Sequence, residues 1–309
     1  MAKIAALFSG QGSQYPGMGR ELRETSAAAR EVYACGGEIL GMDIAKISAE
    51  GTEEELAATS VSQPAIFALS VASFRAAMEE MEASAAVAGH SLGEFAALCC
   101  AGAYSLEDGF RIIAARAAAM DRAAKTAKGA MFAIVGSDEE TVQAACGEAG
   151  GFVQPVNFNL KNQTVISGEE EAAIRAAALL EGKGARVIRL SVASAFHTSM
   201  METAALELAR SLSSIAFHPV KMDFYSNLTG DRLVIEDYPA YFAKHMVSPV
   251  RFVEESAAMA RDGITAAVEF GPKKTVATFL KKNQRGITVH NVEDAETLAK
   301  LPGFLAKLD

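Results

Sequence analysis

The feature that most constrains the fold is a five-residue run, Gly89-His90-Ser91-Leu92-Gly93, between two apolar segments. Residues 85–88 are typical of a short buried strand, and residues 94–100 predict a helix. Glycines on both sides of a serine permit a tight, strained turn that pushes the serine hydroxyl out over the edge of a sheet. The N–H groups at the start of the helix then face any negative charge formed there. The run therefore predicts a nucleophile, Ser91, although an ordinary strand–helix turn is the alternative.

Strands alternate with helices in the first part of the chain, which favours a parallel sheet covered on both faces. Residues 3–8 predict the first strand. A helix is expected from residue 65 to residue 80, with Ser62 as its cap and Pro64 in its first turn. The later elements are expected as a helix after His197, a strand near 222–226, a helix at 238–245, a strand at 266–270 and a helix from residue 275.

The order of elements changes near residues 127–129. We expect a strand at 130–135, a helix at 138–148, strands at 152–158 and 164–167, a helix at 169–181 and a strand at 186–192. This β-α-β-β-α-β order is the ferredoxin-like order. Because the alternating pattern resumes afterwards, the small unit is expected to be inserted into a larger one.

Composition and charge exclude several classes of protein. Of the 309 residues, 50% are hydrophobic and 22% are charged, which is typical of a globular chain. The formal charge of -9 argues against nucleic acid as a partner, because phosphate binding needs a basic face. No apolar run approaches the roughly 18 residues that a membrane helix needs. The N-terminus lacks the features of a signal peptide, so we expect a cytoplasmic location and no membrane association.

The four cysteines show no C-x-x-C spacing. We expect reduced, mostly buried thiols, no disulfide framework and no metal site. The lysine-rich segment 273–285 could form a local basic patch, or simply the solvated face of a helix.

A serine nucleophile needs a base, and histidine is the usual one. The chain has five histidines. His90 adjoins the serine, and neighbours on a tight turn point apart. His218 and His290 lie in turn-like and polar segments, whereas His245 remains a candidate. His197 lies at the junction between the inserted unit and the main sheet, where clefts form, and is the preferred base.

The glycine-rich loop at residues 9–14 invites a dinucleotide-binding interpretation. This fails because G-x-G-x-x-G would need a glycine where Tyr15 stands. The loop could instead bring backbone N–H groups beside Ser91 and, with the N–H of Leu92, form an oxyanion hole.

Arg116 stands among small apolar residues on a long alanine-rich helix predicted from residue 106 to residue 125. It could be an ordinary exposed arginine. Alternatively, its guanidinium could hold a substrate carboxylate through two parallel hydrogen bonds.

Taken together, these segments resemble the malonyl-CoA:acyl carrier protein transacylases, an acyltransferase family shared with the acyltransferase domains of polyketide synthases. The resemblance covers nearly the whole chain. The matching segments are residues 8–14, 62–65, 89–95, 116 with 120, 159 with 163–168, 195–197, 249–252 and 269–272.

The resemblance implies an α/β-hydrolase-like parallel-sheet domain, residues 1–126 and 196–309, with an inserted ferredoxin-like subdomain, residues 127–195. It implies that a malonyl group passes from malonyl-CoA to the nucleophile and then to the phosphopantetheine thiol of acyl carrier protein, in fatty acid biosynthesis. No bound cofactor is implied. We also expect a monomer.

The resemblance also implies roles for individual residues. Ser91 and His197 would be catalytic, and the N–H groups of Gln11 and Leu92 would hold the oxyanion. Arg116 would pair with the free malonyl carboxylate. The ring of the phenylalanine just before the catalytic histidine, Phe196, would disfavour methylmalonyl.

The chain departs from the family pattern at three places. The family often has Gln or Asn where His245 stands, and there the main-chain carbonyl orients the catalytic histidine. The usual Ser-Pro of one loop is replaced by Leu160-Lys161, and Ser9 stands where proline is common. A free-standing polyketide acyltransferase, an acyl hydrolase on the same scaffold and a non-catalytic carrier-binding module remain as alternatives.

Overall fold

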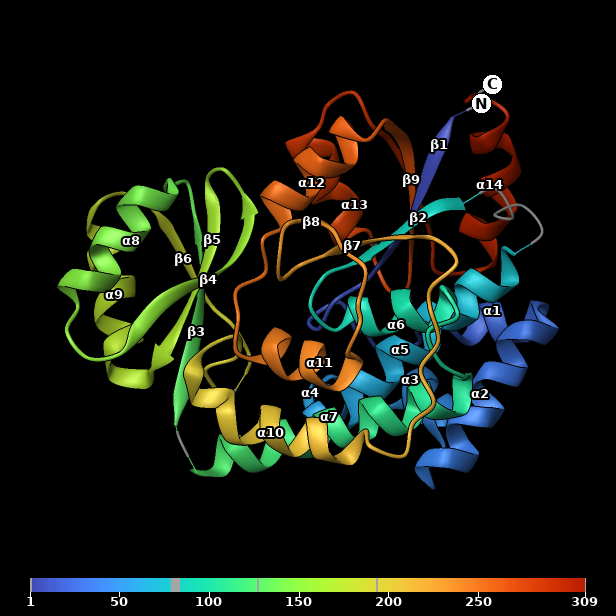
Figure 1. The fold of residues 1–309 in the computed structure, drawn as a ribbon, viewed down its shortest axis with the longest axis horizontal. Coiled ribbons are helices and arrows are strands. Elements are labelled where there is room, and N and C mark those ends of the chain that lie inside the picture. The colour runs from blue at the N-terminus through green and yellow to red at the C-terminus, as the bar shows by residue number, and fades with distance from the viewer. Residues whose placement is uncertain (1, 79–83, 127, 193, 309) are drawn as a thin grey trace.

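The computed structural model describes residues 2–78, 84–126, 128–192 and 194–308, and these residues form two separate β-sheets (Figure 1). In spatial order, the strands of the larger sheet are β10 (Thr288–Val292), β9 (Ile264–Phe270), β1 (Lys3–Phe8), β2 (Ser84–Gly89), β7 (Asp223–Ser226) and β8 (Asp231–Arg232). The first five strands pair in parallel, and β8 pairs antiparallel with β7.

Helices cover both faces of the larger sheet, which explains why the sequence of β1 is apolar almost throughout. Side chains alternate between the two faces of a strand. Ala5 and Leu7 pack in one cluster with α12 (Phe252–Arg261) and α13 (Thr275–Asn283). The side chain of Phe8 packs in the opposite cluster, which contains residues of the helices drawn on the other side of the sheet in Figure 1.

The larger body contains further helices in addition to α12 and α13. They are α1 (Arg20–Thr25), α2 (Ala27–Leu40), α3 (Ile44–Glu50), α4 (Glu53–Ala57), α5 (Thr59–Ala76), α6 (Gly93–Cys100), α7 (Leu106–Thr126), α10 (Glu202–Ser211), α11 (Tyr238–Met246) and α14 (Ala295–Leu305), with a 3₁₀ turn at Ser199–Met201.

The smaller sheet is antiparallel and confirms the predicted β-α-β-β-α-β order. Its strands, in spatial order, are β4 (Val153–Leu160), β5 (Gln163–Glu169), β3 (Gly129–Val135) and β6 (Arg186–Arg189). Helices α8 (Glu139–Glu148) and α9 (Glu170–Gly182) share an apolar core with this sheet and lie on its outer side, away from the larger body (Figure 1). The predicted fold class, a parallel α/β core with a separate antiparallel unit, is therefore confirmed.

The two bodies are joined by backbone hydrogen bonds as well as by the chain. Val250 N–H donates to Val156 O over 2.7 Å, and Phe158 N–H donates to Val250 O over 2.9 Å. We propose residues 1–126 with 196–309, and 127–195, as the two units. Residue 127, at the first of these boundaries, lies outside the described residues.

Two predicted element boundaries were wrong. Helix α5 begins at Thr59, so Ser62 and Pro64 lie inside the helix and Ser62 is no cap. Pro64 lies beyond the first turn of this helix and leaves the carbonyl of Ser60 without its i→i−4 partner. The same helix ends at Ala76, and residues 79–80, where its predicted end falls, lie outside the described residues. Strand β6 ends at Arg189, three residues early, because the chain turns there.

Candidate active site

The tight turn predicted around Ser91 is present between β2 and α6. Ser91 has a left-handed φ of 52°. A Cβ atom on Gly89 would lie 2.1 Å from the carbonyl carbon of Gly93, and one on Gly93 would lie 2.1 Å from Phe8 O. Only glycine fits at either position, so the G-x-S-x-G spacing follows from the contact of the turn with β1 and α6.

His197 is the histidine that the structure brings to Ser91. Its Nε2 lies 2.7 Å from Ser91 Oγ. Its Nδ1 lies 2.9 Å from Ser248 O and 3.3 Å from His245 O. These carbonyls favour the tautomer with the proton on Nδ1, which leaves Nε2 free to accept the serine proton. Burial, helped by the positive charge of Arg116, lowers the pKa of His197 to about 3, so the ring is neutral near pH 7.

The other four histidines, all of which the structure describes, have different partners. His90 Nε2 lies 2.7 Å from Asn159 Oδ1. His245 Nε2 lies 3.3 Å from a Glu94 carboxylate oxygen, and burial lowers the pKa of His245 well below its usual range. The remaining two, His218 and His290, make main-chain contacts away from Ser91. Carbonyl acceptors take the place of the acidic third group that often orients a catalytic histidine.

Backbone strain collects at this site. Among the described residues, the non-glycine residues with a left-handed φ are Ser91, His197 and Lys273, and all three line one cavity. Such conformations cost of order 1–3 kcal/mol each and persist only where the surroundings enforce them. The strain therefore points to the same site as the hydrogen bonds do.

The loop that follows β1 lies against this cavity and is held by its own hydrogen bonds. Ser13 Oγ donates to Gly10 O over 2.6 Å, and Ser9 Oγ donates to a buried carboxylate oxygen of Glu269 over 2.8 Å. Gln11 lines the cavity. Within the described residues, the N–H groups of Gln11 and Leu92 donate to no other residue. Both are thus available to an oxygen atom bound beside Ser91.

Arg116 is buried in α7 rather than exposed, with only 2% of its surface accessible. Its guanidinium lies 5.1 Å above the ring of Phe95, and its Nε and Nη1 atoms have no hydrogen-bond partner among the described residues. Burial lowers the pKa of Arg116 to about 10, so the side chain stays charged near pH 7. A buried, unpaired guanidinium in a cavity wall is a ready partner for a carboxylate.

The cavity has a volume of about 650 Å³ and receives side chains from both bodies of the fold. Phe196 lines it and is mostly buried. The wall from the smaller sheet includes Met131, Val165 and Asn157. The predicted catalytic and substrate-binding residues therefore line one cavity together with Gln11. Leu92 does not line it, and its expected contribution is its main-chain N–H group.

The structure shows the surroundings of all three departures from the family pattern. His245 presents its main-chain carbonyl to His197, although Ser248 O is nearer. Leu160 and Lys161 lie where β4 turns into β5. Ser9 is buried and hydrogen-bonded, as described above.

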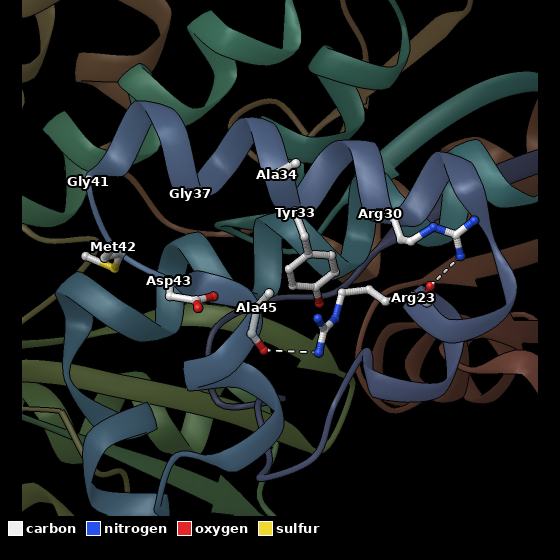
Figure 2. Close-up of a pocket in the computed structure, with 9 residues that line it drawn as sticks. All are labelled: Arg23, Arg30, Tyr33, Ala34, Gly37, Gly41, Met42, Asp43 and Ala45. Atoms are coloured by element: carbon white, nitrogen blue, oxygen red, sulfur yellow. Dashed lines mark hydrogen bonds between the residues drawn. The ribbon is translucent and has the colours of Figure 1, made fainter.

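A second hollow, of about 510 Å³, lies between α1, α2 and α3 (Figure 2). Arg23 and Arg30 line it, but both donate to main-chain carbonyls, and Arg23 also lies 5.2 Å from the ring centre of Tyr33. None of the nine described residues that line it is a serine, cysteine or histidine. This hollow therefore lacks the groups that acyl transfer needs.

Ser248 and Asn227 were not predicted as site residues, and Asn159 was named only as a position that matches the family pattern. Ser248 acts through its carbonyl, which no side-chain pattern reveals. Asn227 directly follows β7, and a polar side chain at the carboxyl end of a parallel strand is a signal that could have found it.

No helix among the described residues combines the length and apolar character needed to cross a membrane. The same residues contain no group of three or more histidine, cysteine, aspartate or glutamate side chains arranged to hold a metal ion. The four cysteines are free thiols.

Comparisons with known proteins agree on one family. The sequence matches the family model described as the acyl transferase domain over residues 6–303. It is 35% identical over 303 residues to the malonyl CoA-acyl carrier protein transacylase of Bacillus subtilis (strain 168), with 96% of each chain covered. The structure is similar to the crystal structure of MCAT from Streptococcus pneumoniae, with a TM-score of 0.90, 36% identity and coverage of 97% of this chain and 100% of that one.

A further solved structure contains a partner. It is a malonyl-transacylase in complex with its type II PKS acyl-carrier protein, and it matches with a TM-score of 0.93 and 33% identity over 97% of this chain and 99% of that one. The similarities extend over both sheets, since they cover nearly the whole chain.

Proposed function

The chain belongs to the acyl transferase domain family, and from this premise we propose that it transfers a malonyl group from malonyl-CoA to the phosphopantetheine thiol of an acyl carrier protein. The observation that carries the proposal is the hydrogen bond of 2.7 Å between Ser91 Oγ and a neutral His197, in the same cavity as the unpaired Arg116. The related transacylases are malonyl CoA-acyl carrier protein transacylases by name, which supports malonyl as the group transferred.

In the first half-reaction, His197 Nε2 accepts the proton of Ser91 Oγ while the oxygen attacks the thioester carbonyl carbon. The carbonyl oxygen becomes negative, and the N–H groups of Gln11 and Leu92 donate to it. The C–S bond then breaks, CoA leaves as the thiol with the proton from His197, and a malonyl ester of Ser91 remains.

In the second half-reaction the same groups act in reverse. His197 accepts the proton of the phosphopantetheine thiol, and the sulfur attacks the ester carbonyl. Ser91 leaves and regains the proton, so the enzyme returns to its starting state. The neutral His197 suits both steps because each needs a free lone pair on Nε2.

Selectivity for malonyl is proposed to come from two residues. Arg116 forms charge-assisted hydrogen bonds with the free carboxylate, which an acetyl group lacks. Phe196 crowds the carbon that would carry the methyl group of methylmalonyl. The main-chain carbonyl of His245 helps that of Ser248 to orient His197.

Adduct mapping tests the proposal. Incubation with labelled malonyl-CoA should give a malonyl-enzyme with the label on Ser91, and Ser91→Ala should give no labelled protein. His197→Ala should fold and label at least 100-fold more slowly, because it loses the general base. Label that persists in Ser91→Ala would contradict the assignment of the nucleophile.

A hydrolase on the same scaffold is the main competitor, since a serine and a histidine also suffice for ester hydrolysis. Measuring the loss of malonyl-CoA with and without carrier protein separates the two. A transferase consumes malonyl-CoA much faster when carrier protein is present, whereas equal rates would favour a hydrolase.

We propose fatty acid biosynthesis as the pathway, with a type II polyketide system as the alternative. The ratio of kcat/KM for carrier proteins from the two systems discriminates between them. The expected monomer and cytoplasmic location remain predictions, and gel filtration and cell fractionation check them.

A further inference from the structure

Asn227 lies beneath the Ser91 turn and does not line the catalytic cavity. It follows β7 directly, and none of its surface is accessible. All the polar groups of its side chain have partners. Two of these partners belong to the turn that carries the nucleophile.

The carboxamide of Asn227 bridges the two sides of that turn. Its Oδ1 accepts the main-chain N–H of Ser91 over 2.6 Å. Its Nδ2 donates to the main-chain carbonyl of Gly89 over 2.7 Å. These two bonds fix the backbone before and after His90, where the chain has the strained φ of Ser91.

Two buried carboxyl groups bind Asn227, one at its carboxamide and one at its main chain. Nδ2 also donates to Glu255 Oε2 over 2.7 Å, and the main-chain N–H of Asn227 donates to Glu94 Oε1. If the carboxamide were flipped, its NH₂ group would face another donor, the Ser91 N–H. Its oxygen would face two acceptors, Gly89 O and Glu255 Oε2. Only one orientation satisfies every group, so Glu255 holds the carboxamide that holds the turn, while Glu94 holds the main chain of Asn227.

We propose that Asn227 is a positioning residue for acyl transfer, which enforces the left-handed conformation of Ser91 and thereby aims its hydroxyl at His197. The inference rests on Ser91 being the nucleophile, as proposed above. Asn227 makes no contact with the cavity, so it acts on the nucleophile and not on binding of the thioester.

Asn227→Ala is the test, with single-turnover malonylation of Ser91 and steady-state kinetics as readouts. Loss of the bridge should lower the acylation rate and kcat about 100-fold, as expected when a reacting atom is misplaced. The KM for malonyl-CoA should stay within about twofold of the wild-type value, since a positioning residue leaves uniform binding unchanged. The rate of sulfonylation of Ser91 by phenylmethanesulfonyl fluoride should fall in parallel.

If Asn227 only stabilised the fold, its loss would lower thermal stability and leave the acylation rate of the folded protein unchanged. The control is Tyr225→Phe, which removes a hydrogen bond of 2.9 Å from a buried residue of the same strand to Asp262, without touching the turn. This variant should lose thermal stability yet acylate at the wild-type rate. If folded Asn227→Ala also acylates at the wild-type rate, or changes only KM, the inference is wrong.

Asn227→Asp replaces the alanine variant if that one fails to fold. It keeps the volume and the acceptor for the Ser91 N–H, but it loses the donors to Gly89 O and Glu255 Oε2. It should show the same pattern with a smaller loss of rate, about 10-fold, and wild-type acylation by the folded variant would overturn the inference. Absence of label on wild-type Ser91 would instead refute the proposed function, so the two failures are distinguishable.

Discussion

Burial gives three residues around the cavity quite different properties. It keeps His197 neutral and able to accept a proton. It leaves Arg116 charged but without a partner for two of its nitrogen atoms. It raises the pKa of Glu94 to about 8, even though an N–H group and a tyrosine hydroxyl donate to this carboxyl. One low-dielectric region therefore supplies a base, a cation and a carboxyl group that resists ionisation.

Arg116→Ala should lower kcat/KM for malonyl-CoA by about 30-fold or more, because truncating one partner of a buried charge pair costs about 2–5 kcal/mol. Transfer of acetyl from acetyl-CoA should stay the same or rise, since acetyl has no carboxylate to pair. Parallel assays with the two thioesters measure the ratio. Equal losses for both would show that Arg116 supports the fold and not the carboxylate.

Arg116→Lys serves as the matched variant. It retains the positive charge but lacks the planar fork that binds a carboxylate in two places. Its malonyl activity should lie between those of the wild type and the alanine variant.

Glu94→Gln should change how stability depends on pH. The free carboxyl has a pKa of about 4.5 and the buried one of about 8. Between these values the folded chain holds a proton that the unfolded chain has released, so the contribution of Glu94 is full below about pH 4.5 and is lost as pH rises to about 8. Thermal melts at pH 5.5 and pH 8 should show the variant gaining stability over the wild type as pH rises. If the difference in Tm between the variant and the wild type is the same at both pH values, Glu94 is not the group that holds the proton.

The candidate residues that the structure brings into one cavity were predictable where a side chain carries the signal. Ser91 and Arg116 stood out because one lies in a glycine-flanked turn and the other among alanines. The sequence could not reveal that Ser248 O lies nearer than His245 O to His197, because a carbonyl acceptor has no residue-type signature. Asn227 was missed because its role depends on β7 lying beside β2, which is a fact of sheet order.

At the scale of elements, the turn between β2 and α6 depends on close backbone contact. Gly93→Ala should destabilise the protein by about 3 kcal/mol or more and abolish acylation, since the added methyl group would overlap Phe8 O and backbone cannot move aside cheaply. Denaturant unfolding and the labelling assay measure both effects. Gly147→Ala in α8 is the control, because a Cβ there meets nothing within 4 Å. It should leave activity intact and stability equal or higher by up to about 1 kcal/mol.

Elements with a clear hydrophobic period and clear turn residues at their ends were predicted well, as in α7 and in the order of elements in the smaller sheet. The start of α5 was not. Ser62 and Pro64 form a plausible local start, but the helix begins at Thr59 and Ser62 lies buried inside it. Local capping rules fail there because a residue packed into the core within a helix cannot serve as its cap.

At the scale of the whole molecule, the proposed function requires this acidic chain to meet a carrier protein that we expect to be acidic. The net charge of -9 repels an acidic partner, so positive side chains near the cavity become important for binding it. Thr275, Val276 and Phe279 of α13 line the cavity, and Lys282 lies three residues beyond Phe279 on the same helix. Lys282 is exposed, so it is the candidate to steer the partner.

Lys282→Glu should raise the KM for carrier protein about fivefold, with kcat and the KM for malonyl-CoA unchanged. The effect should shrink at 0.5 M salt, because salt screens exposed charges. Lys46→Glu on α3 makes the same change of charge on a helix that does not line the cavity and should leave both KM values unchanged. An unchanged KM for carrier protein in Lys282→Glu would place the docking surface elsewhere.

The place of β1 in the middle of the larger sheet has a consequence for how the protein is made. β1 is synthesised well before its neighbour β9, which begins at Ile264. At about 5–20 residues per second, β1 waits roughly 13–50 s for that neighbour. Until then one edge of an apolar strand is open, and unpaired edges of this kind invite association with other chains. Nascent chains stalled before β9 should therefore depend on chaperones far more than the finished protein does.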